Sequence, residues 1–325
     1  MRLLGVELTR LRSRLAIVLL LSIGLASTAL FAWAAFGSAQ PMTDAQLAEA
    51  ETQWELARQD WEETGDEQVA SCEEAEAAES EAAGEELDFG CDELAPQREW
   101  FFWQPPPFDE FVGAALSSGQ MILCLVALMV GVTFVAAEFA SGSIGTWLTF
   151  EPRRIPVFVS KIGATALAGL LFGLVWTALF MAANAAGYAL AGSEVTIAAT
   201  QVHTVARAAV LAMAVAVAGA GLAFVVRHTA AALGIAIGYL IGVDMILLGA
   251  VVPGGQRWTL VNNITAWITG RPVSYYEDSC TVEAGGTVCD WVERTVSMSQ
   301  GGVVTLAMVL VVTVVALLTF RHRDV

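Results

Sequence analysis

The chain contains 325 residues with a net charge of -17, and its mean hydropathy is +0.62 because 56% of the residues are hydrophobic and only 15% are charged. This composition excludes a single soluble domain and is typical of a protein that lies mostly in lipid. The negative charge is local: 22 of the 33 acidic residues fall within residues 37–112, and the rest of the chain is slightly basic.

The N-terminal residues 1–14 are predicted to form an amphipathic interfacial helix on the inner leaflet of a membrane. Leucines recur every three or four residues along one side, and the charged residues lie off this stripe. An uninterrupted apolar run over residues 15–36 follows and is long enough to be the first span. A cleavable signal peptide that ends near residue 39 is the alternative interpretation.

Five further apolar segments have the length of a membrane span. They cover residues 113–137, 160–191, 203–226, 231–252 and 301–325, the last with a short tail. Lys and Arg concentrate at both termini and in the second and fourth connections, which is the pattern of cytoplasmic segments. The sequence therefore predicts an all-α polytopic protein with six transmembrane helices in the plasma (inner) membrane and both termini in the cytoplasm. We expect a bacterial source.

Residues 37–112 are predicted to form a large, acidic and mainly helical extracytoplasmic domain between spans 1 and 2. Thr43 and Gln46 have the spacing of a capping box, and Trp54 and Trp61 lie on one face of the helix that would follow. The remainder is rich in Ala and Glu but has few apolar anchors. It is therefore either a solvated helix or partly disordered.

Four of the five cysteines lie in the predicted outer segments, which indicates an oxidising compartment. We expect the disulfides Cys72–Cys91 and Cys280–Cys289, with Cys124 reduced in the second span; reduced cysteines or bonds between the two loops are the alternatives. In the outer segment 253–300, a Gly-Gly pair between β-branched residues predicts a small disulfide-closed hairpin between spans 5 and 6. Ahead of it, residues 258–268 are too short to span and predict a surface or re-entrant helix.

The predicted cytoplasmic loop 138–159 carries the most informative motif. Residues 142–150 favour a short amphipathic helix that ends before Pro152 and would present a compact knob to a partner protein; an ordinary charged turn is the simpler alternative. The motif consists of Glu138, Gly142, Ser143, Leu148, Pro152, Arg154 and Lys161. Its spacing resembles the inner loop of type-2 ABC transporter permeases, the membrane subunits of ATP-driven exporters. The N-terminal helix and the six spans are also similar to that family.

This resemblance implies a coupling helix that receives the motion of separate ABC ATPase subunits, with Glu138 and Arg154 bracing its ends. It also implies a second permease, either identical or related, and a translocation path for a lipid, drug, peptide or polymer. The single lysine, Lys161, follows Val159-Ser160, so the chain has no phosphate-binding loop. We expect no enzymatic activity and no cofactor in this chain, with ATP and Mg bound by the partner ATPase. Membrane lipid and an extracytoplasmic partner of the acidic domain are further expected partners; nucleic acid is not.

Three polar residues of the predicted spans, Asp244, Asn184 and Tyr239, are candidates for the translocation path. A charge at mid-span costs about 2.5–3.5 kcal/mol on insertion scales, so Asp244 should be protonated, paired or facing a polar cavity. Hydrogen bonds to neighbouring helices are the structural alternative for all three residues. The three histidines lack the spacing of a metal site, and we expect no metal.

Two other functions are compatible with these features. The acidic domain would suit a mechanotransmitting or sensory membrane protein that binds an outer partner without transport. A proton-driven secondary transporter that uses Asp244 ranks below it, because such transporters are built from repeats and none is evident here.

Overall fold

Six helical segments of the computed structural model are long and apolar enough to cross a membrane, as the sequence predicts. The structure describes residues 2–84, 86–197, 199–283 and 286–323. The amphipathic helix α1 (Arg2–Ser13) precedes the spans. The spans are α2 with α3 (Leu15–Ala26 and Thr28–Ser38), α5 (Phe108–Ala140), α7 (Arg154–Leu190), α8 (Ala199–Val226), α9 with the π-helix η3 (Thr229–Gly238 and Tyr239–Val251) and α11 (Met298–His322).

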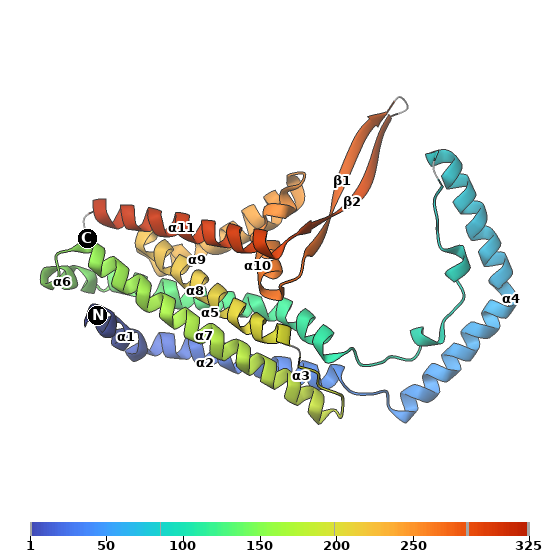
Figure 1. Ribbon diagram of the computed structural model, residues 1–325, viewed down its shortest axis with the longest axis horizontal. Helices are drawn as coiled ribbons and strands as arrows, with labels where there is room; N and C mark the ends of the chain where they lie inside the picture. The colour runs from blue at the N-terminus through green and yellow to red at the C-terminus, as the bar shows by residue number, and fades with distance from the viewer. Residues whose placement is uncertain (1, 85, 198, 284–285, 324–325) are drawn as a thin grey trace.

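Helices α5, α7 and α8 form the centre of the bundle (Figure 1). Small residues let them approach closely: a Cβ added to Gly169 or Gly173 of α7 would lie 2.7 Å from backbone atoms of α8. Close backbone packing of this kind is how helices associate in lipid, where the hydrophobic effect does not drive them together. The fifth span is the opposite case, because only 11% of its most apolar window is buried. Most of the surface of the fifth span therefore faces away from the other helices of the bundle.

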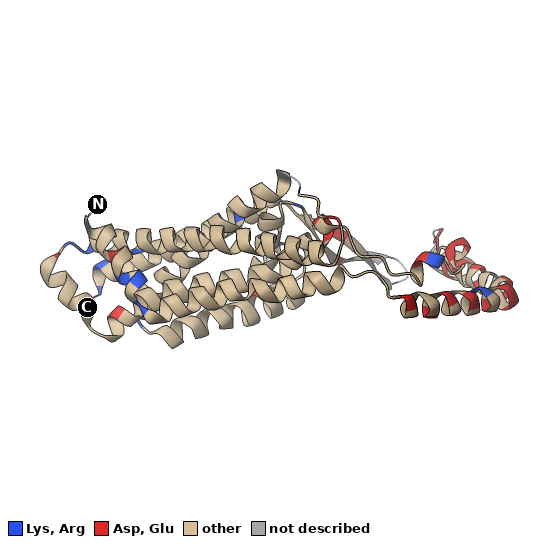
Figure 2. Cartoon of the chain, turned by 90° about the horizontal axis from the view of Figure 1, so that it is seen from below, with Lys and Arg blue, Asp and Glu red and all other residues tan. Residues whose placement is uncertain are grey.

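The two ends of the bundle differ in charge and in architecture. Both termini lie at one end with the short helix α6 (Ser143–Phe150), which we call the α6 end (Figure 1). The other, the hairpin end, carries α10 (Leu260–Thr269), the short helix η4 (Gly255–Trp258) and the strands β1 (Val273–Glu283) and β2 (Gly286–Val296). Lys and Arg gather at the α6 end, whereas Asp and Glu concentrate on α4 (Asp44–Ala83), which projects beyond the hairpin end (Figure 2).

The segment before the last span contains both elements that the sequence predicts, with different bounds. The helix expected over residues 258–268 is α10, and the hairpin runs from Val273 to Val296, well beyond its two cysteines. The strand register places Cys280 opposite Cys289. The side chains of these two residues lie outside the described part of the chain, so their disulfide stays a prediction.

The acidic domain is one 40-residue helix with a returning segment beside it. The capping box is present: the Gln46 backbone N–H donates to the Thr43 hydroxyl, and the Gln46 side chain accepts from the Thr43 N–H. The short helices η1 (Cys91–Glu93) and η2 (Arg98–Trp100) lie in the returning segment. Arg98 forms an ion pair of 2.6 Å with Glu51, and the structure joins Cys72 to Cys91. These contacts tie the returning segment to α4.

Removing the Cys72–Cys91 bridge is expected to release the returning segment. The bond closes a sequence separation of 19 residues, for which the chain-entropy model gives about 3 kcal/mol. The variant with Cys72→Ser and Cys91→Ser should therefore be cleaved faster between residues 87 and 103 in limited proteolysis. Cys124→Ser is the matched control, because Cys124 is a free thiol within α5. Equal cleavage of the two variants, or free thiols at both positions in oxidised protein, would contradict the pairing.

Candidate functional site

Helix α6 lies at the extremity of the α6 end (Figure 1). It lies between α5 and α7, as predicted for residues 142–150, and Gly142 begins it with φ of 68°. Ile144 is fully buried against the bundle, Trp147 and Leu148 are half-buried, and Phe150 is 80% exposed. The helix therefore has one face anchored in the protein and one available to a partner.

Gly142 is expected to be essential for the sharp turn into α6. An L-residue in the left-handed region costs about 1–2 kcal/mol, and no atom lies within 4 Å of a Cβ added there, so Gly142→Ala should destabilise α6 through backbone strain alone. The matched control is Gly145→Ala inside α6, which also has open space and should stabilise the helix by about 0.5–1 kcal/mol. Amide hydrogen exchange over residues 143–150 should rise in the first variant and fall in the second. The same change in both would contradict the conformational role.

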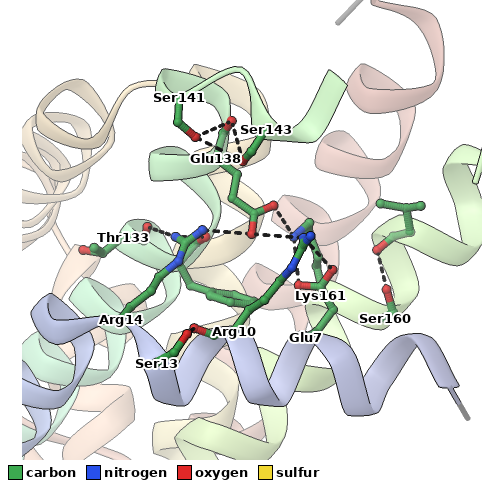
Figure 3. Close-up of polar contacts among 12 residues, drawn as sticks. Glu7, Arg10, Ser13, Arg14, Thr133, Glu138, Ser141, Ser143, Ser160 and Lys161 are labelled. Atoms are coloured by element: carbon green, nitrogen blue, oxygen red, sulfur yellow. Dashed lines mark hydrogen bonds and ion pairs between the residues drawn. The ribbon is translucent and has the colours of Figure 1, made fainter. Parts of the chain in front are cut away.

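A buried set of charges lies directly behind α6. It consists of Glu7 and Arg10 of α1, Arg14 between α1 and α2, Glu138 of α5 and Lys161 of α7, and we call it the ion cluster (Figure 3). Lys161 lies 2.9 Å from Glu7 and also contacts Glu138, while Arg14 lies 2.9 Å from Glu138. Arg10 is 3.9 Å from both carboxylates. Three helices that are distant in sequence are therefore joined by charge.

The two carboxylates and the lysine of the cluster are buried, whereas Arg10 and Arg14 are 35% and 25% exposed. Glu7 and Lys161 are 0% exposed and Glu138 is 1% exposed, so each carboxylate needs a close cation to offset the loss of water. The Arg14 guanidinium also donates to the Phe134 carbonyl at 2.8 Å. The Phe134 ring lies 5.4 Å from Arg14 and 5.2 Å from Lys161, within the range of cation–π attraction.

The ion cluster is connected to α6 at two points. The Arg10 guanidinium lies 4.3 Å from the centre of the Trp147 ring, and Trp147 belongs to α6. On the other side of the turn, the Ser143 hydroxyl donates to the Glu138 backbone carbonyl. A displacement of α6 would therefore act on both α1 and the end of α5.

The two residues expected to brace α6 lie on either side of it in the chain and have different partners. Glu138 belongs to the ion cluster, whereas Arg154 donates to the carbonyls of Phe320 at 3.0 Å and Arg323 at 2.6 Å. Arg154 thus fixes the start of α7 to the end of α11. Between these positions the exposed Pro152 separates α6 from α7. Arg153 donates a hydrogen bond to the Glu151 carboxylate, and this bond lowers the pKa of Glu151.

Sequence reasoning missed Glu7, Arg10 and Arg14 as members of this site. These residues were expected only as the charged side of a helix on the membrane surface, yet the structure turns Glu7 fully into the bundle. Their spacing of three and four residues places them on one face of a helix, and that was the available signal. The sequence could not show that this face meets Glu138 and Lys161.

The three path candidates have separate environments. Asp244 is 1% exposed and accepts hydrogen bonds from the backbone N–H groups of Leu260 and Val261, so it caps the start of α10. Asn184 donates to the Phe180 carbonyl of its own helix at 2.7 Å. Tyr239 lines an apolar cavity. The alternative of a bond to a neighbouring helix thus describes Asp244, whereas Asn184 bonds within its own helix, and the described contacts do not join the three residues.

Among the described residues, no group of three His, Cys, Asp or Glu side chains could hold a metal ion. The site therefore consists of packed helices and fixed charges. Such a site can transmit a displacement or bind a protein.

Comparison with known proteins agrees with the predicted resemblance. A family model described as ABC-2 family transporter protein matches residues 7–325, nearly the whole chain. A search of curated proteins finds no match. With the six candidate spans, the chain belongs to the ABC-2 transporter family and is a multi-pass transporter membrane subunit.

Proposed function

We propose that this chain is the permease subunit of an ABC exporter and that α6 is the helix on which a separate ATPase acts. The observation that carries the proposal is the position of α6. It exposes Phe150 outward while its inner face contacts the ion cluster through Trp147. A helix with this arrangement can receive a push from a partner and pass it to the spans.

The transmission would follow the contacts in order. Motion of α6 acts on Arg10 of α1 through Trp147, and on the end of α5 through the turn at Gly142. The ion cluster then joins α1 to α5 and α7, two of the three central helices. Because buried ion pairs resist separation, these helices would move as one body.

The distribution of charge supports an orientation with the α6 end in the cytoplasm. Most of the arginines and the only lysine gather at that end, as the positive-inside rule requires (Figure 2). The acidic domain and the hairpin would then lie outside the cell, where the Cys72–Cys91 bond can persist. Both termini would be cytoplasmic in a plasma (inner) membrane.

The remaining subunits are inferred from what this chain does not carry. It lacks a phosphate-binding loop, so ATP and Mg would be bound by two ABC ATPase subunits beneath it. The outward fifth span offers a surface for a second permease, either a copy or a related chain, and a path between two permeases would carry a lipid, drug, peptide or polymer.

Docking on α6 is tested by Phe150→Ser. This change removes an exposed apolar side chain and should abolish co-purification with the ATPase and vanadate-sensitive efflux, while thermal unfolding of the permease stays unchanged. Leu190→Ser is the matched control, because Leu190 is 79% exposed at the opposite end of α7. If both variants keep ATPase binding and efflux, α6 is not the docking site. ATPase binding without any efflux would instead support a mechanotransmitting protein.

A further inference from the structure

A cavity of about 480 Å³ lies between α5, α8, the fifth span, α10 and α11. Its walls are formed mostly by aliphatic side chains, including Leu125, Leu128, Leu222 and Val312, and Tyr239 also lines it. No acidic or basic side chain is among the described residues that line it. The volume lies within the range of pockets that hold drug-sized ligands.

Two polar atoms in this apolar wall have no hydrogen-bond partner. Gln120 of α5 is 2% exposed; its amide nitrogen donates to the Thr265 hydroxyl, and its Oε1 is left unpaired. Thr305 of α11 is 8% exposed, and its Oγ1 is unpaired too. Buried polar groups in a membrane protein are normally satisfied, since no water is available in the hydrocarbon region. A purely hydrocarbon occupant would leave both atoms unsatisfied.

Both unpaired atoms lie toward the same end of the cavity. Gln120 lies two turns closer to the start of α5 than Leu128, and Thr305 lies two turns closer to the start of α11 than Val312. Both helices begin at the hairpin end (Figure 1). The two polar residues thus lie nearer the hairpin end. The apolar remainder of the cavity extends toward the middle of the bundle.

We propose that this cavity binds an uncharged amphiphile whose hydroxyl donates to Gln120 Oε1 and accepts from the Thr305 hydroxyl, while its hydrocarbon part fills the apolar remainder. The lining has no charge to pair with a charged headgroup, and burying an unpaired charge is strongly unfavourable, so charged amphiphiles are excluded. Use of this cavity for cargo rests on the proposed function, whereas ligand binding itself does not.

Photolabelling of the purified chain in nanodiscs tests the site. The probe is a long-chain alcohol with a diazirine in its tail, compared with its methyl ether, which lacks the donor, and with its trimethylammonium analogue. We expect the alcohol to label peptides 120–128 and 305–312 about tenfold more than either comparison probe. Equal labelling by alcohol and ether would overturn the proposal.

Thr305→Val sharpens the test because it keeps the shape of the side chain and removes one unpaired oxygen. It should reduce labelling by the alcohol several-fold and leave the unfolding temperature equal or higher, which separates a lost contact from a failure to fold. Thr313→Val is the control on the same helix, since the Thr313 hydroxyl donates to Val309 O at 2.7 Å and lies outside the cavity lining. Equal labelling of these two variants would also overturn the site.

The source of the amphiphile is resolved in the complex with the ATPase. If ATP turnover lowers labelling by the alcohol, the site holds transported cargo; if labelling is unchanged, the site holds a resident lipid. Both results support ligand binding. Because labelling of the isolated chain needs no ATPase, an ATPase that fails to bind α6 would leave this result intact.

Discussion

Replacing Glu138 by glutamine is expected to lower the free energy of unfolding by about 3–5 kcal/mol, the cost typical of removing one partner from a buried ion pair. Glu138 lies within 3.9 Å of three cations, Arg10, Arg14 and Lys161. Without the charge of Glu138, Glu7 would be the single carboxylate of the cluster left to offset these three cations. The variant should unfold at a lower temperature in detergent, and amide exchange in α1 should rise because Arg10 and Arg14 lose their ion pairs with α5.

Glu62→Gln provides the matched control for Glu138→Gln. Glu62 also lies 2.8 Å from an arginine, Arg58, but its side chain is 60% exposed, so its loss should cost less than about 0.5 kcal/mol. Adding Lys161→Met to Glu138→Gln should recover part of the lost stability, because one uncompensated cation is then removed. Equal unfolding temperatures for Glu138→Gln and Glu62→Gln would show that the cluster does not stabilise the α6 end.

Much of the fold could be predicted because its signals are local. Each span is a continuous apolar run, the capping box from Thr43 to Gln46 spans four residues, and α6 is bounded by Gly142 and Pro152. Hydropathy and short-range hydrogen bonding decide these features before any tertiary packing. The sequence does not decide between a continuous α4 and partial disorder, because Ala and Glu favour a helix without providing contacts that hold it.

The ion cluster could not be predicted because its partners are distant in sequence. Lys161 and Glu7 are separated by 154 positions, and only the packing of α1 beside α7 brings them together. The motif drew attention to Glu138 and Lys161, but as members of an inner loop and not as parts of a buried network. The π-helical form of the fifth span had no local signal either, since its apolar sequence fits an α-helix equally well.

The second large effect is expected at Asp244, whose carboxylate caps α10 from within the fifth span. Thr259, the residue that precedes α10, makes no side-chain capping bond, so Asp244 is the side chain that accepts from the first N–H groups of this helix. At the other end, the Arg207 guanidinium donates to the carbonyls of Ile268 and Thr269. A negative group at the start of a helix and a positive group at its end both interact favourably with the helix dipole. Asp244 and Arg207 therefore stabilise α10.

Asp244→Asn should therefore cost about 2–3 kcal/mol, since hydrogen bonds to a charged group are lost and one amide NH₂ must face a backbone N–H. The protein should still insert, but amide exchange over residues 260–269 should rise and efflux should fall, because α10 also holds Gln120 through Thr265. Met245→Leu is the control, as Met245 is the adjacent residue of η3 and is 63% exposed. If α10 exchanges at the same rate in both variants, Asp244 does not hold this helix, and a role in the translocation path would have to explain its burial.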